Sequence, residues 1–105
     1  MRRSALRPLS VTLEQVARAA APATLLARVQ AAWPQVAGRA VAAAAAPVSE
    51  REGVVTVVCE SAVWSGELEL LAPDLLARLN AHVAPDEAAR VRRLRFVIGS
   101  LPNRL

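Results

Sequence analysis

Four arginines lie close together near the C-terminal end of the chain, and they are the residues best suited to bind an anion. In an extended strand, residues two apart project from the same face at a separation of about 6.6 Å. Arg93 and Arg95 have this spacing, which is close to the distance between successive phosphates of a nucleic-acid strand. The alternative is a solvated sheet face on which the arginines pair with Glu50 and Glu52. The candidate nucleic-acid-binding residues are Arg90, Arg92, Arg93 and Arg95.

A tryptophan is the second candidate for contact with a partner. Trp64 begins a stretch in which leucines recur at helical spacing, and acidic residues follow it. A tryptophan in such a stripe can belong to the core, whereas one exposed at the start of a helix would anchor a partner protein. Trp33 lies in a longer apolar face beside Pro34. We therefore expect Trp33 in the core and leave both interpretations of Trp64 open.

Catalytic chemistry has few candidate residues. His82 is the single histidine, and the chain has no tyrosine. No two carboxylates lie in surroundings that would give one a higher pKa than the other, as acid and base catalysis by a carboxylate pair requires. His82 also lacks neighbouring acids for a metal site, so we expect it at the surface or at a helix end. The four glycines are too widely spaced for a phosphate-binding loop. The sequence thus predicts a non-enzymatic protein without a metal, a cofactor or a small-molecule substrate.

The single cysteine, Cys59, excludes a disulfide framework and a thiolate metal cage. It lies in an apolar stretch, so we expect an inert buried thiol. A lone cysteine is also typical of a reducing compartment. The chain has no apolar run long enough for a signal peptide or a membrane span, which favours a cytoplasmic protein that does not contact a membrane.

Charge is segregated along the chain. The net charge is +4, from 13 basic and 9 acidic residues, and every basic residue is arginine. Residues 1–46 carry six arginines and one acid, residues 47–89 two arginines and eight acids, and residues 90–105 five arginines. A polyanion would therefore be attracted to one part of the protein, which favours a single basic face over a protein that is basic all over. Aromatic residues make up 3% of the chain, too few to stack on a series of bases, so we expect no reading of base sequence.

A chain of 105 residues can form one domain with one hydrophobic core. In the basic first segment, apolar residues do not recur at a regular spacing, and this predicts a flexible lead-in. The expected organisation is a lead-in at residues 1–11, a single domain at 12–99 and a short tail at 100–105.

Apolar residues at steps of three and four predict helices. Pro34 interrupts one of them, where it cannot donate to the carbonyl of Gln30, so a kink or break is expected near Trp33. Pro73 stands where a following helix would begin, which predicts a bend at Ala72. The expected helices cover about residues 12–20, 26–45, 61–71 and 73–82, with Ser61 as the cap of the third.

Three short stretches predict β-strands. Residues 48–50 and 54–59 flank a polar turn that ends at Gly53, which is typical of a hairpin. The second of these strands is apolar on both faces and therefore suits a central position. In residues 92–98, apolar and cationic side chains alternate, as in a half-buried strand. We predict an α+β domain of order α-α-β-β-α-α-β, with three antiparallel or mixed strands and helices on one face.

Several short motifs follow one another in a fixed order along residues 24–99. They are Trp-Pro-Gln-Val-Ala-Gly at 33–38, Pro-Val at 47–48 with the hairpin after it, Ser-Ala-Val-Trp-Ser-Gly-Glu-Leu at 61–68, Leu-Leu-Ala-Arg-Leu-Asn at 75–80, and Leu-Arg-Phe-Val-Ile-Gly at 94–99. The ordered set resembles the DciA family, bacterial proteins that assist loading of the replicative helicase DnaB.

The resemblance implies a KH-like fold of the second type, α-β-β-α-α-β, and contact with both the helicase and DNA. The positions that carry over for helicase contact are Trp64, Glu67 and Leu68. For DNA, which we expect to be single-stranded and bound without sequence specificity, the basic last strand around Arg95 is inferred from the residues themselves. A Gly-x-x-Gly loop, through which KH domains bind single strands, has no counterpart in this sequence.

Three functions are compatible with these features. The first is a replication accessory protein that docks on the helicase through the Trp64 helix and holds DNA through arginines. The second is a small KH-like RNA-binding module. The third is a protein-interaction domain without a nucleic-acid role, which would show no salt-dependent binding to any polynucleotide.

Overall fold

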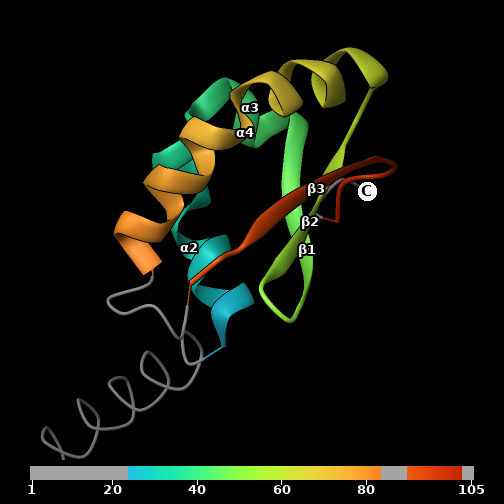
Figure 1. The fold of residues 1–105 in the computed structure, drawn as a ribbon. Helices are drawn as coiled ribbons and strands as arrows, with labels where there is room; N and C mark the ends of the chain where they lie inside the picture. The colour runs from blue at the N-terminus through green and yellow to red at the C-terminus, as the bar shows by residue number, and fades with distance from the viewer. Residues whose placement is uncertain (1–23, 84–89, 103–105) are drawn as a thin grey trace, which may run out of the picture.

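The computed structural model describes residues 24–83 and 90–102. Within these residues, helices and strands form two layers (Figure 1). The lead-in expected at residues 1–11 and the helix expected at 12–20 lie outside the described residues. In chain order the elements are α2 (Leu25–Ala37), α3 (Arg39–Ala44), β1 (Ala45–Arg51), β2 (Val54–Cys59), α4 (Ala62–Val83) and β3 (Arg93–Ile98).

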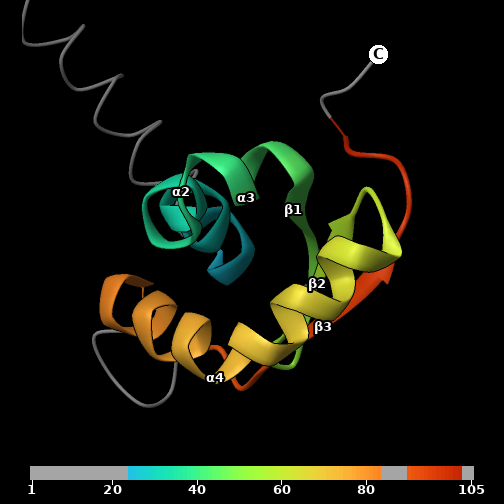
Figure 2. The same cartoon turned by 90° about the horizontal axis from the view of Figure 1, so that it is seen from above.

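The sheet has the strand order β1-β2-β3. Strand β2 pairs antiparallel with β1 and parallel with β3, so the sheet is mixed and β2 has the expected central position. Helices α2 and α4 lie on the same side of the sheet, and no described helix or strand covers the other face, which we call the open face (Figure 2). The predicted α+β class with helices on one face is confirmed. The observed order is α-α-β-β-α-β, because α4 replaces two expected helices.

A two-residue turn joins β1 to β2. Glu52 and Gly53 both have positive φ, at 52° and 85°, as a tight hairpin turn with the sheet's twist requires. The N–H of Gly53 donates to the Glu50 carboxylate over 2.8 Å. A Cβ at Gly53 would come within 2.6 Å of the Arg92 side chain, so the turn packs closely against the start of β3. Strand β1 therefore extends to Arg51, which the sequence analysis had left in the turn.

Helix α2 runs through Pro34, so of the expected kink or break near Trp33 the break is absent. The proline deprives the carbonyl of Gln30 of its donor, but both residues are exposed, and water can satisfy that carbonyl. The break lies at Gly38, whose φ of 94° is open to glycine and strained for other residues. Helix α3 begins directly after it.

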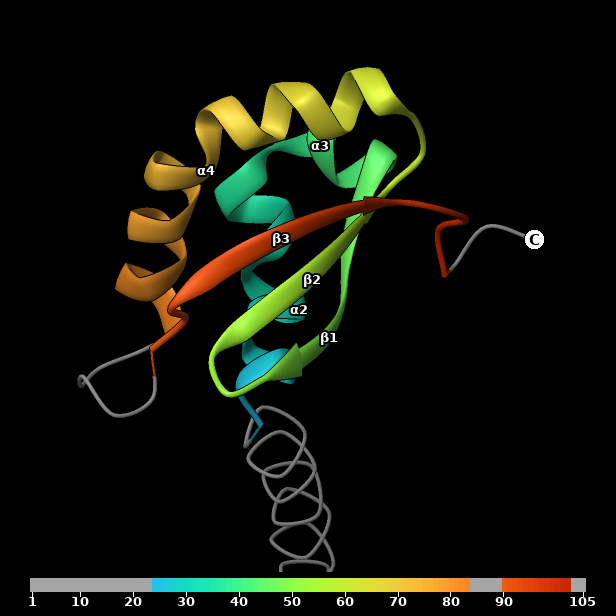
Figure 3. The ribbon, with the colours of Figure 1, turned by 45° about the vertical axis from the view of Figure 1, so that its right-hand side comes forward.

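Helix α4 is also continuous, and it contains Pro73. Two helices with a bend at Ala72 were expected here. The structure shows the bend, but within one long helix (Figure 3). A proline is the usual cause of such a bend, and Pro73 is exposed, as is Glu69, whose carbonyl loses its donor. If the two halves of α4 are counted separately, the order becomes α-α-β-β-α-α-β, which has one helix more before β1 than the order α-β-β-α-α-β implied by the resemblance. The expected cap is present, since Ser61 Oγ accepts from the N–H of Trp64 over 3.3 Å.

Trp33 joins the helices to the sheet. Its ring is 3% exposed, as expected for a core residue. Its indole N–H donates to the carbonyl of Ala45 over 2.9 Å. Ala45 pairs with Cys59, so β1 begins inside the alanine-rich stretch that had been assigned to a helix. Sheet pairing and this hydrogen bond outweigh the helix propensity of alanine here.

The core lies between the sheet and the helices. Helix α2 supplies Val29, Trp33 and Val36, and α4 supplies Leu68, Leu75, Leu79 and Val83, which pack on Val55, Val57, Cys59 and Leu94 of the sheet.

A bidentate contact joins the end of α4 to the segment before β3. The Asn80 side chain accepts from the N–H of Val91 over 2.7 Å and donates to its carbonyl over 2.9 Å. Val91 is 1% exposed. Asn80 thereby satisfies both polar groups of a buried backbone residue and sets where β3 begins.

Replacing Asn80 with Ala should leave the N–H and the carbonyl of Val91 without partners. Since one buried unsatisfied group costs about 1–3 kcal/mol, we expect the free energy of unfolding to fall by roughly 3 kcal/mol in urea denaturation followed by circular dichroism. The control is Gln30→Ala, which removes one hydrogen bond from an exposed residue to the Pro47 carbonyl and should cost less than about 1 kcal/mol. Equal losses in the two variants would contradict this role of Asn80.

Candidate nucleic-acid interface

The open face of the sheet brings arginines from two strands together. Val54 of β2 pairs with Arg51 on one side and with Arg93 on the other. One step along, Thr56 pairs with Ser49 and with Arg95. Paired residues project from the same face of a sheet. Arginines therefore stand on both sides of a strip formed by Val54 and Thr56.

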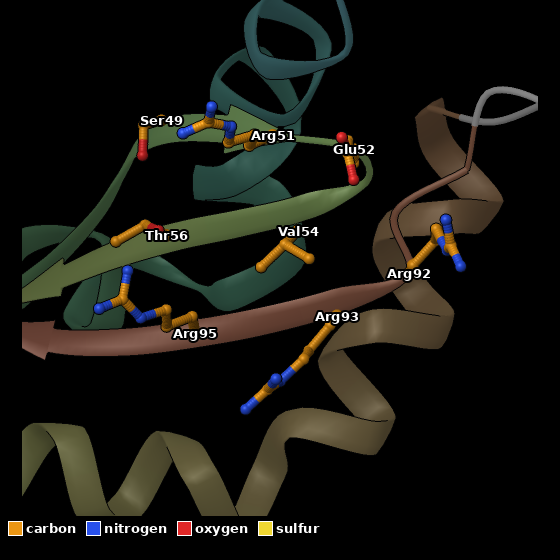
Figure 4. Close-up of a pocket in the computed structure, with 8 residues that line it drawn as sticks. All are labelled: Ser49, Arg51, Glu52, Val54, Thr56, Arg92, Arg93 and Arg95. Atoms are coloured by element: carbon orange, nitrogen blue, oxygen red, sulfur yellow. The ribbon is translucent and has the colours of Figure 1, made fainter.

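These side chains border a shallow groove of ≈ 700 Å³ on the open face (Figure 4). Arg95 extends from β3 over Thr56, whereas Arg93 extends past β3 toward α4. The hydroxyls of Ser49 and Thr56 add two groups that can donate hydrogen bonds to an anion. We call this site the arginine groove, and its lining residues are Ser49, Arg51, Glu52, Val54, Thr56, Arg92, Arg93 and Arg95.

The arginine groove is strongly cationic. Its four arginines and one acid, Glu52, give a formal charge of +3 (4 − 1). None of these arginines pairs with a carboxylate of residues 24–83 or 90–102. The alternative pairing with Glu50 and Glu52 is therefore not present. The Glu50 carboxylate instead accepts from the hairpin turn. The guanidinium groups keep their donors available for a ligand.

The described residues that line the arginine groove include no aromatic side chain. Ring stacking is the usual way in which a sheet surface holds the bases of a single strand. A surface of arginines and small hydroxyls contacts phosphate and sugar, and these contacts position a strand without reading its sequence.

The structure brings three of the four predicted arginines into the arginine groove and adds one that was missed. Arg90 is exposed ahead of β3 and does not line the groove. Arg51 was missed because it was placed in the turn. Recognising Glu52 and Gly53 as a two-residue turn would have placed Arg51 in β1, opposite Val54.

A second, smaller hollow of ≈ 370 Å³ lies between α4 and β3. Arg93 and Arg95 border it on one side and Glu69 on the other, with Ala72 and Phe96 also in its lining. The two arginines of β3 are thus accessible from both sides of this edge strand, and the acid of α4 bounds the cationic surface.

The three residues predicted for partner contact lie at different depths in α4. Trp64 is half-buried and packs against the core, so it supports the core from one side and keeps part of its surface exposed. Glu67 is exposed. Leu68 is 0% exposed and belongs to the core, so it holds the helix onto the sheet from beneath and is not part of the surface.

The other candidates for chemistry occupy the places expected of them. Cys59 is fully buried, and burial raises the pKa of its thiol, with a further contribution from the negative charge of Glu69. His82 is exposed near the end of α4, with Nδ1 3.1 Å from the carbonyl of Arg78. Residues 24–83 and 90–102 contain no cluster of three potential metal ligands. No helix in the same residues is long and apolar enough to cross a membrane.

Comparison with known proteins gives one family. The model of the family described as Dna[CI] antecedent, DciA, matches residues 8–96. A UPF0232 protein of Streptomyces avermitilis is 48% identical over 50 residues, which are 46% of this chain and 28% of that protein. A UPF0232 protein of Mycobacterium tuberculosis is 32% identical over 71 residues, which are 68% of this chain and 36% of that protein. The chain thus matches about a third of the length of these curated relatives.

The buried thiol gives a test of the packing beneath α4. We expect Cys59 in the native protein to react with a disulfide reagent at least about 100-fold more slowly than after unfolding in urea, because reaction requires local opening. The raised pKa also predicts a pH dependence. As the pH rises through the ordinary thiol pKa, the unfolded state loses this proton first, so the contribution of Cys59 to stability declines. Rapid labelling of the native protein near neutral pH would contradict the burial.

Proposed function

Because the chain belongs to the DciA family, we propose that it is a non-enzymatic replication accessory protein that binds a DnaB-type helicase and DNA and assists helicase loading. The family supports the helicase-loading role. Since the chain matches only part of its relatives' length, the domain is proposed as the unit that makes these contacts.

The observation that carries the DNA part of this proposal is the arginine groove. Arg51, Arg93 and Arg95 stand on an open sheet face without carboxylate partners among the described residues. Each can donate two parallel hydrogen bonds to a phosphate. Arg92 lies at one end of the groove and extends the cationic surface along the path of a strand (Figure 4).

A single strand fits this surface better than a duplex does. The groove is shallow and crosses three strands of a small sheet, and no described helix projects from the open face to enter a major groove (Figure 2). A flexible strand can bend so that successive phosphates reach arginines on β1 and β3. The lack of aromatic lining supports binding without sequence specificity.

The helicase contact is proposed for the first half of α4. Trp64 exposes part of its ring there, and the side chain of Glu67 lies on the surface. Large aromatic side chains that are only partly covered are typical anchors of protein interfaces. Leu68 supports this surface from the core.

The arginine groove predicts a charge-dependent binding of single-stranded DNA. About three phosphate contacts should give a log–log slope against salt near −2 for a labelled oligothymidylate in fluorescence anisotropy. Arg93→Ala together with Arg95→Ala should remove about 1.4 of this slope, and Arg51→Ala about 0.7. Arg39→Ala changes an exposed arginine of α3 on the helix side of the sheet and is the matched control.

The same titrations decide between the proposal and its rivals. Tighter binding of structured RNA than of single-stranded DNA would favour a KH-like RNA-binding module. Absence of salt-dependent binding to any polynucleotide would leave a protein-interaction domain. An unchanged slope in the Arg51, Arg93 and Arg95 variants would place the nucleic acid elsewhere on the protein.

Helicase capture is tested by pull-down of the DnaB-type helicase of the same bacterium. Trp64→Ala should reduce capture at least about tenfold, as loss of an anchor residue does. Because Trp64 also packs on the core, the variant is checked by circular dichroism and by its retained DNA binding. Glu67→Ala changes an exposed side chain without disturbing the core and should reduce capture less. Full capture by a folded Trp64→Ala variant would refute the role of this residue.

A further inference from the structure

Three large apolar side chains project from one face of α4 into solvent. Val63 is 74% exposed, Leu70 80% and Leu71 48%, whereas a leucine in a domain of this kind is usually buried. They are spaced by seven and eight residues, which places them on one side of a helix. We call this set the α4 strip.

The α4 strip is separate from the face that α4 turns toward the sheet. That inner face is formed by Leu68, Leu75, Leu79 and Val83, all of them buried. The strip lies on the outer side, and no described element covers it. The helix is therefore apolar on two sides in its first half, although the core needs only one.

Acidic residues accompany the α4 strip. Glu67 lies between Val63 and Leu70 on the same face, and Asp74 lies one turn further along. Of the three acids in residues 62–77, Glu69 borders the hollow beside β3, so Glu67 and Asp74 are the acids on the side of the α4 strip. The first base after them, Arg78, forms an ion pair with Asp74 over 3.0 Å. An apolar strip bordered by carboxylates complements a partner with apolar side chains and a basic border.

Other occupants of the α4 strip are disfavoured by these charges. A second copy packed antiparallel about Leu70 would bring Glu67 against Asp74 of the other helix, where like charges repel. Nucleic acid is disfavoured by the same carboxylates, as is an anionic membrane surface. A helix that lays its apolar face along α4 and carries lysine or arginine at its edges meets both requirements.

We propose that the α4 strip of Val63, Leu70 and Leu71, bordered by Glu67 and Asp74, binds a basic amphipathic helix of a protein partner. The surface is assigned from exposure, spacing and charge. Its identification with the helicase contact rests on the proposed function. On this assignment Trp64 lies at the edge of a longer apolar interface along α4.

The first test uses the full chain and the DnaB-type helicase of the same bacterium, with affinity measured by biolayer interferometry. Leu70→Ser combined with Leu71→Ser should weaken binding at least tenfold. Ala77→Ser combined with Ala81→Ser is the matched control, because these exposed residues continue the same face beyond the bend of α4. Single-stranded DNA binding should stay unchanged in both double variants, which shows that the fold and the arginine groove are intact.

The second test examines the charge border. Glu67→Lys should weaken helicase binding at low salt, and the difference from the unaltered chain should shrink at high salt, because screening removes the repulsion. Helicase affinity within twofold of the unaltered chain in the Leu70→Ser, Leu71→Ser variant would overturn the identification of the α4 strip with the helicase contact.

A third measurement separates this inference from the proposed function. A synthetic helical peptide with leucines along one face and lysines beside them should shift the amide NMR signals of residues 62–74. The same peptide with glutamates in place of the lysines should not. If the unaltered chain captures no helicase but the lysine peptide produces these shifts, the helicase assignment fails and the α4 strip stands. If the lysine peptide leaves these signals unchanged, the inference fails whatever the helicase result.

Discussion

Strands β2 and β3 run parallel, so the chain has to travel back along the sheet between them. Helix α4 makes this return, and its length and position follow from that requirement. It crosses the face already occupied by α2, which buries one side of the sheet and leaves the other without a cover from the described elements. The arginine groove and the α4 strip both follow from this connection. The open face of the sheet gathers side chains from all three strands, and no described element covers the outer side of α4.

Much of this fold is visible in the periodicity of the sequence. The alternation in residues 92–98 predicts a half-buried strand, and the doubly apolar stretch at 54–59 predicts a central strand; the structure has both, with β3 at an edge of the sheet. The boundaries near prolines and alanines were less predictable. Pro34 and Pro73 remain inside helices because their exposed neighbours leave the freed carbonyls to water. Ala45 joins a strand because its contacts with Trp33 and Cys59 outweigh the helix propensity of alanine, and these partners are too distant in sequence for local periodicity to reveal them.

The candidate site was predictable where it depended on one strand and less so where it depended on pairing. The spacing of Arg93 and Arg95 predicts a common face without further information. Arg51 joins them only through the register of two strand pairs, and a shift of one residue would send it to the other face. Likewise, the leucine repeat of α4 predicts a helix but does not say which leucines face the core. Leu68 proved to be internal and Leu70 external, a distinction that the sheet beneath the helix determines.

The cations of the open face are all guanidinium groups, since the chain contains no lysine. Acetylation of lysine, a common way for cells to weaken basic surfaces, therefore has no target on this face. Ionic strength and competing polyanions are left as the variables that adjust how strongly this face attracts its ligand.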